Sequence, residues 1–227
     1  MWKENTTTND GITSMIENGA IADLLTDIVQ DNDYDDSYYD IGNEIYTNNN
    51  HNHNNNNVVY EPIRVTSEKH YISAIAKLIP SPDWFSGFYM FNTIDELSNT
   101  WYQKFSIPLY PYDGGIIDGD TYNSNIQRTI PPQPITKFTN NDGNKIFLNY
   151  EGDAILPLGT YTCTLEVVSN SNNENNDDPT RTPTLSPIMQ SLITTPTSSS
   201  SSFISPSFLS SWFPIISIIH LLLIFCC

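Results

Sequence analysis

The chain has 227 residues, of which 9 are lysine or arginine and 26 are aspartate or glutamate, so its formal net charge is -17. Such an acidic surface repels a phosphate backbone, which argues against nucleic acid as a partner. The charge fits a cation, a basic protein surface or simple solubility, and the length suits one domain of ordinary size.

The beginning of the chain predicts a helix in two pieces. Gly19 is expected to separate the pieces, and Ser14 with Glu17 forms a candidate capping box. Asn5 begins an Asn-x-Thr sequence and is the predicted N-glycosylation site. The apolar residues show the three- and four-residue spacing of a helix lying on a core, and they are Ile12, Met15, Ile16, Ile21, Leu24, Leu25, Ile28 and Val29.

Two segments after the helix predict surface loops. Residues 31–36 carry alternating aspartates like the start of a calcium loop, but Asp36 stands where the turn needs glycine and Gly42 where a bidentate glutamate is needed. We therefore interpret this segment as a solvated acidic loop. Residues 47–57 are almost pure asparagine, an insert too polar to pack, whose two histidines lack a third metal ligand.

Four later segments predict strands, at residues 70–79, 101–109, 145–150 and 160–168. Short strands separated by proline and glycine turns, with helical signal only at the start, predict an all-β fold: an antiparallel β-sandwich with a short N-terminal helical segment. Cys163 is expected on a strand as a small buried residue, because the three cysteines form no disulfide framework. Trp84 and Trp101 are expected in the core.

The composition changes at Ser169. Residues 169–211 are rich in Ser, Thr, Asn and Pro and predict a stalk. Residues 212–227 are apolar apart from Ser217 and His220, which is short for a spanning helix. Small residues followed by a spacer and an apolar tail favour a glycolipid-anchor signal with attachment at Ser200, and a retained tail anchor is the alternative. Both predict a membrane-anchored protein at the cell surface.

Several acidic residues follow predicted strands and are candidates for a site. Asp83 follows one strand, Asp113 ends another, and Asp118 lies in the glycine-rich turn after it. Carboxylate and backbone oxygens in such a turn suit calcium, although the pattern alone favours a solvated acidic rim. Asp113 with Asp118 would also suit acid–base chemistry on a sugar, so a carbohydrate-active hydrolase is an alternative function.

Two motifs in this region resemble the spondin domain. They are PSPDWFSG at residues 80–87 and LYPYDGG at residues 109–115, joined by Trp101, Gly119 and TIP at residues 129–131. Residues 10–19, DGITSMIENG, also resemble the helix that precedes the strands in this family. The resemblance covers about residues 11–168, and the family's first strands would precede the helix, so we expect residues 1–168 to be an N-terminally incomplete copy.

The resemblance implies a β-sandwich with a calcium site at one end and an extracellular adhesion or matrix-binding role without catalysis. Its calcium ligands carry over to Asp83 and Asp113, while Ile117 stands where the family has a third acid. Either Asp118 substitutes after a small backbone shift or the site is weakened. The implied partners are an extracellular matrix protein, a cell-surface protein or a glycan, and a purely structural wall or matrix component is a further alternative.

Overall fold

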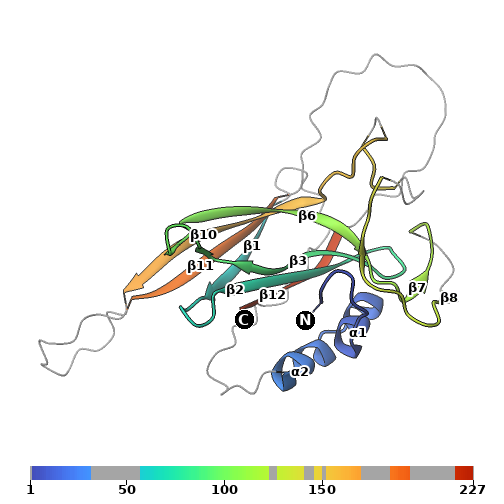
Figure 1. The fold of residues 1–227 in the computed structure, drawn as a ribbon, viewed down its shortest axis with the longest axis horizontal. Helices are drawn as coiled ribbons and strands as arrows, with labels where there is room; N and C mark the ends of the chain where they lie inside the picture. The colour runs from blue at the N-terminus through green and yellow to red at the C-terminus, as the bar shows by residue number, and fades with distance from the viewer. Residues whose placement is uncertain are drawn as a thin grey trace, which may run out of the picture.

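The computed structural model describes residues 2–31, 57–122, 127–140, 146–149, 152–169, 185–194 and 218–226 (Figure 1). Most of the predicted acidic loop, the asparagine insert and Ser200 lie outside these residues. The described elements are α1 (Asp10–Asn18), α2 (Ala22–Asp31), β1 (Asn57–Arg64), β2 (Tyr71–Leu78), β3 (Trp84–Asn92), β4 (Ile94–Asp95), β5 (Thr100–Trp101), β6 (Lys104–Asp113), β7 (Ile117–Asp118), β8 (Gln127–Arg128), β9 (Thr136–Lys137), β10 (Gly159–Ser169), β11 (Leu185–Thr194) and β12 (Ile218–Cys226).

The helical segment is split at Gly19, as predicted. Gly19 adopts a left-handed conformation with φ of 72° and donates its N–H to the carbonyl of Met15, which ends α1. The candidate capping box is wrong, because the N-cap is Asn9, whose side chain accepts from the N–H of Ile12 at 2.9 Å. Ser14 lies inside the helix and donates to Asp23 of α2 at 2.8 Å.

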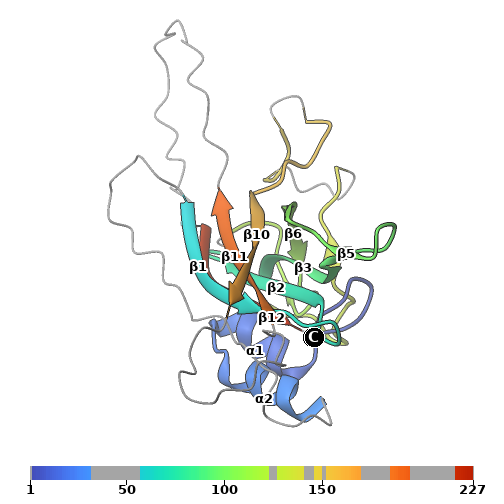
Figure 2. The same ribbon diagram turned by 90° about the vertical axis from the view of Figure 1, so that its left-hand side faces the viewer.

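The strands form one antiparallel path in the order β1-β11-β10-β6-β3-β2-β12, with β9 also pairing with β6. Strand β6 belongs to two layers: its first half, from Lys104 to Leu109, pairs with β10, and its second half, from Tyr110 to Asp113, pairs with β3. Figure 2 shows β1, β11 and β10 side by side. The all-β antiparallel prediction is therefore confirmed.

The main core lies between the two layers. It takes side chains from the first layer and from one face of β2 and β3, and its buried members are Ile63, Val65, Ile72, Ala74, Ala76, Phe88, Leu109, Tyr161 and Cys163. Trp101, which was expected in the core, packs against it while partly exposed, as do Phe105 and Ile107. Trp84 is fully buried in a smaller cluster with Leu78, Phe138 and Phe147.

The helices cover the other face of β2 and β3 (Figure 1). Their second core contains Ile12, Met15, Ile16 and Leu24 from the helices together with Trp2, Ile75, Phe85, Ile116 and Ile135. The strand predicted at residues 70–79 is therefore confirmed as β2, but both of its faces are covered: Ile72, Ala74 and Ala76 face the first core and Ile75 the second. Polar residues of β2 consequently lie in the interior, which matters for the site below.

Three features differ from the sequence expectations. Residues 146–149 contribute only an isolated bridge between Leu148 and Ile155, with no extended partner strand in the described part of this region. Strand β11 lies within the predicted stalk, where its short apolar stretch is surrounded by Ser, Thr and Pro. Strand β12 lies within the predicted anchor tail and pairs with β2. No helix among the described residues is long and apolar enough to cross a membrane.

Candidate functional site

Asp83 lies in the turn between β2 and β3, at the centre of the candidate site. Its side chain is fully buried, and its Oδ2 accepts hydrogen bonds from the backbone N–H groups of Ile116 at 2.8 Å and Ile117 at 3.0 Å. Its Oδ1 is also buried and has no hydrogen-bond partner among the described residues. The carboxylate therefore joins two turns separated by more than thirty positions in the sequence, a long-range contact that fixes one turn on the other.

The second turn, which we call the acidic turn and define as residues 113–118, needs its glycines. The N–H of Gly115 donates to Oδ1 of Asp113 at 2.7 Å, and Gly115 has a φ of 70°, in the left-handed region. A Cβ on Gly114 would lie 2.9 Å from the carbonyl oxygen of Asp83 and 2.3 Å from the side chain of Ile16. Any larger residue at Gly114 would push the acidic turn away from Asp83.

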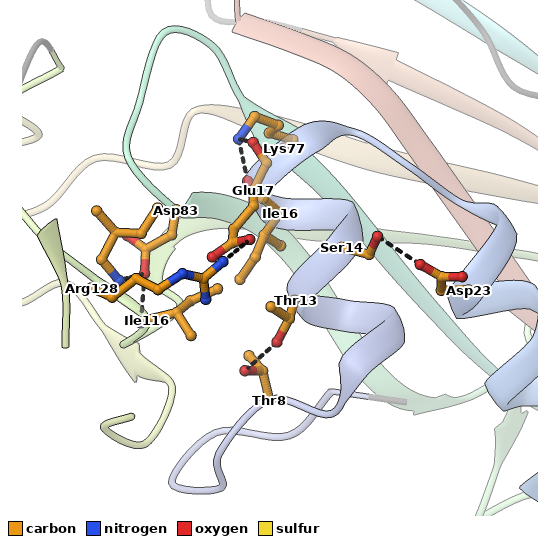
Figure 3. Close-up of polar contacts among 11 residues, drawn as sticks. Thr8, Thr13, Ser14, Ile16, Glu17, Asp23, Lys77, Asp83, Ile116 and Arg128 are labelled. Carbon is orange, nitrogen blue, oxygen red and sulfur yellow. Dashed lines mark hydrogen bonds and ion pairs between the residues drawn. The ribbon is translucent and has the colours of Figure 1, made fainter. Parts of the chain in front are cut away.

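A lysine from β2 is the second buried charge of the site. The side chain of Lys77 is 6% exposed, and its Nζ donates to the backbone carbonyls of Ile16 and, at 2.9 Å, Glu17. These carbonyls belong to the last turn of α1, where helical partners are lacking, so the ammonium completes the helix end. Figure 3 shows Lys77 reaching this end of α1.

Burial shifts both charged groups toward their neutral forms. It lowers the pKa of the Lys77 ammonium, and the negative charges of Asp83 and Glu17 oppose that shift in part. Burial likewise raises the pKa of the Asp83 carboxyl, although its two backbone hydrogen bonds and the charge of Lys77 act in the opposite direction. The two groups therefore stabilise each other's charged form inside the protein.

Glu17 and Arg128 complete this arrangement, which we call the charge cluster: Glu17, Lys77, Asp83 and Arg128. Oε2 of Glu17 accepts from Arg128 of β8 at 2.8 Å, whereas Oε1 is buried without a partner in the described part of the chain (Figure 3). The Arg128 side chain is 60% exposed, so the pair itself adds little stability. It nevertheless connects α1 to the strand that follows the acidic turn.

The predicted calcium ligands are not brought together as a complete set. Asp118 lies on β7 with its side chain exposed, and Ile117, at the position of the family's third acid, has an apolar side chain that is 6% exposed. Within the described ranges no three His, Cys, Asp or Glu side chains are grouped closely enough to hold a metal ion. Calcium takes six to eight oxygen ligands. These ligands can include backbone carbonyls and water, so the calcium site stays a prediction, and we derive no role from a bound ion.

Three members of the charge cluster, Glu17, Lys77 and Arg128, were not predicted as site residues. Lys77 carried a usable signal, since it is the one charged residue in the run 72–78, where Ser73 is the only other polar residue. A charge in a strand covered on both faces needs polar partners. The partners of Lys77 are the backbone carbonyls of Ile16 and Glu17, and no sequence pattern predicts that they lie next to this lysine.

The acidic turn also supports an exposed loop at residues 129–134. The N–H of Thr129 donates to the carbonyl of Ile116 at 2.9 Å, and the N–H of Gln133 donates to the carbonyl of Gly115 at 2.8 Å. Between these two bonds Ile130 is 87% exposed and is followed by Pro131, Pro132 and Pro134. We call residues 129–134 the proline loop. Its position depends on the turn that Asp83 holds.

Two other predicted residues can be placed. Asn5 is exposed, and its backbone N–H donates to the carbonyl of Ile135 at 2.9 Å, so its side chain is accessible for modification. Cys163 is fully buried in the main core, as predicted, and burial raises the pKa of its thiol to about 12. Ser200 lies outside the described residues.

Comparison with known proteins gives consistent matches. The family model Spondin_N matches residues 1–157. Spondin-2 of Homo sapiens is 32% identical over 77 residues, which is 34% of this chain and 23% of that protein. Spondin-2 of Rattus norvegicus is 35% identical over 72 residues, 30% of this chain and 20% of that protein. Spondin-1 of Xenopus laevis is 33% identical over 97 residues, 41% of this chain and 12% of that protein. The matches thus span less than a quarter of each relative.

Proposed function

Since this chain belongs to the Spondin_N family, we propose that it is a non-enzymatic extracellular module that binds a component of the matrix or the cell surface. The observation that carries the proposal is the proline loop, an exposed apolar segment fixed to the interior by backbone hydrogen bonds. A loop held by a rigid scaffold is the usual place for recognition residues. The three prolines of the proline loop also restrict its backbone, so the loop would lose little further conformational entropy on binding a partner.

The acidic residues support this function better than catalysis. Asp83 is fully buried and bonded to backbone N–H groups, so it lies out of reach of a substrate. Oδ1 of Asp113 is engaged by Gly115, and Asp118 is exposed on a separate strand. A glycosidase needs two carboxyl groups facing one sugar. The arrangement of these acids favours a structural role in positioning the proline loop.

Two loops at opposite ends of β6 allow a matched test. Leu97, in the turn between β4 and β5, is 98% exposed and precedes β6, whereas Ile130 follows it. The ten residues of β6 separate these ends by about 30 Å. The soluble chain, carrying Ile130→Asp or Leu97→Asp, would be measured for saturable binding to extracellular matrix laid down by cultured cells.

We expect Ile130→Asp to weaken binding by at least about tenfold, as for a central apolar contact residue, and Leu97→Asp to leave it unchanged. Equal loss in both variants would mean that general surface hydrophobicity drives the binding. A wild-type chain that shows no reversible binding would favour the alternative of a purely structural matrix component. The proposal does not include cell-surface display through residues 212–227, because the predicted anchor signal contains the residues of strand β12 that pair with β2.

A further inference from the structure

We propose that the edge of β2 is a strand-docking site, and that the apolar segment Ile218–Cys226 serves as its strand rather than as a membrane anchor. Strand β12 pairs antiparallel with β2, with Leu222 opposite Ala76 and a continuous register through to Cys226 opposite Ile72. The pairing makes β12 the last strand of the second layer, next to the helices (Figure 1).

The two ends of the sheet path show why β2 needs a covering strand. At the opposite end, β1 carries the features of a strand that ends a sheet: Pro62, which has no N–H to offer, the charged Arg64, and a register shift between Tyr60 and Ile63. Strand β2 contains no proline, although its register with β3 shifts between Ile72 and Ala74 and its register with β12 shifts between Ile218 and Leu222. Its one charged residue is Lys77, whose ammonium is already bonded to the end of α1. Left unpaired, β2 would be a long apolar edge, which promotes aggregation.

The sequence of β12 matches this position. A strand covered on both faces reads as a continuous apolar run, and 218–226 reads IIHLLLIFC, with His220 as its one polar side chain. The nine residues of β12 extend over about 31 Å and the eight of β2 over about 27 Å, so one strand covers the other.

The native Cys226 provides a direct test in the full chain. In a background of Cys163→Ala and Cys227→Ser, Ile72→Cys places a second thiol opposite Cys226. We expect mild oxidation to give an intramolecular disulfide between residues 72 and 226, identified by peptide mapping. The control is Ile75→Cys, which stands opposite Leu223, about 10 Å along the strand from Cys226 and beyond the reach of a disulfide.

A second measurement covers the case in which the core substitution at Ile72 prevents folding. Hydrogen exchange on the unsubstituted chain compares the amides of β2 with those of β1, and we expect slower exchange in β2 because it is paired on both sides. Flotation with phosphatidylcholine vesicles completes the experiment, and the chain is expected to remain unbound. The proposal is overturned by equal cross-linking of both cysteine variants, by β2 amides that exchange as fast as an unpaired edge, or by co-flotation with the vesicles.

Discussion

Replacing Asp83 tests whether its carboxylate positions the acidic turn. Asp83→Ala leaves the N–H groups of Ile116 and Ile117 buried without an acceptor, at about 1–3 kcal/mol each, so we expect a loss of about 2–6 kcal/mol in the free energy of unfolding. Asp83→Asn retains a carbonyl oxygen that can accept both bonds, and we expect a loss of about 1 kcal/mol. Asp118→Ala, on an exposed side chain, should change stability by less than about 0.5 kcal/mol.

Urea denaturation measures these differences, and thermal unfolding gives an independent check. A loss of about 3 kcal/mol corresponds to a fall of roughly 6–12 °C in Tm for a chain of this size. The reasoning would be refuted if Asp83→Asn were as damaging as Asp83→Ala, because the negative charge and not the acceptor would then be the essential feature. A loss below about 0.5 kcal/mol for Asp83→Ala would refute it as well.

The same variants predict a pH dependence. The pKa of Asp83 is raised in the folded protein, so the folded state binds this proton more tightly than the unfolded chain does. The stability contributed by this proton is complete below about pH 4, the unfolded value, and is lost as the pH rises through the folded pKa. The deficit of Asp83→Asn relative to the wild type should therefore shrink between pH 4 and pH 7. A deficit that grows over this interval would contradict the direction of the shift.

Three further predictions concern packing, the thiol and calcium. A Cβ on Gly87 would lie 2.1 Å from the carbonyl oxygen of Ala74, so Gly87→Ala should lower the free energy of unfolding, measured by denaturation, by about 3 kcal/mol. The control Gly152→Ala should cost about 1 kcal/mol, because Gly152 has a φ of 75° but nothing lies within 4 Å of a Cβ built there. Cys163 should react with a thiol reagent at pH 8 only after unfolding, as measured in Cys226→Ser/Cys227→Ser, and rapid labelling of the native chain would contradict its burial. Calcium at about 1 mM should shift Tm by less than about 1 °C relative to chelator, whereas a site with a Kd of about 10 μM would add about 2.7 kcal/mol, or roughly 5–11 °C.

Local patterns predicted several elements well, because they depend on neighbouring residues. The spacing of apolar residues and Gly19 predicted the two helices, and alternation predicted β2 and β10. The second covered face of β2 was not predictable in this way, since it depends on α1 packing from a distant part of the sequence. Residues 145–150 have the composition of a strand, but in 146–149 only Leu148 finds a bridge partner, and a strand exists only where another pairs with it.

The C-terminal segment shows a different limit. An apolar run has the same composition whether it enters lipid or covers a sheet edge. The two cases differ in whether the edge of β2 needs a covering strand, and this can be judged only when the faces and edges of β2 are assigned in the structure. The segment 185–194 is similar: its alternation is short, and the surrounding Ser, Thr and Pro composition dominated the prediction of a stalk.

Ile117 explains how the acidic turn can keep its shape without the family's third acid. Asp83 holds the turn through backbone N–H groups, and a backbone N–H is present whatever side chain its residue carries. Exchanging a carboxylate for an isoleucine at Ile117 therefore leaves this hydrogen bond intact and adds buried apolar surface. Calcium binding, in contrast, depends on the number of oxygen ligands, and exchanging a carboxylate for an isoleucine lowers that number. The turn geometry that positions the proline loop is thus separable from the capacity to bind calcium, because Asp83 and Asp113 hold the turn through backbone N–H groups.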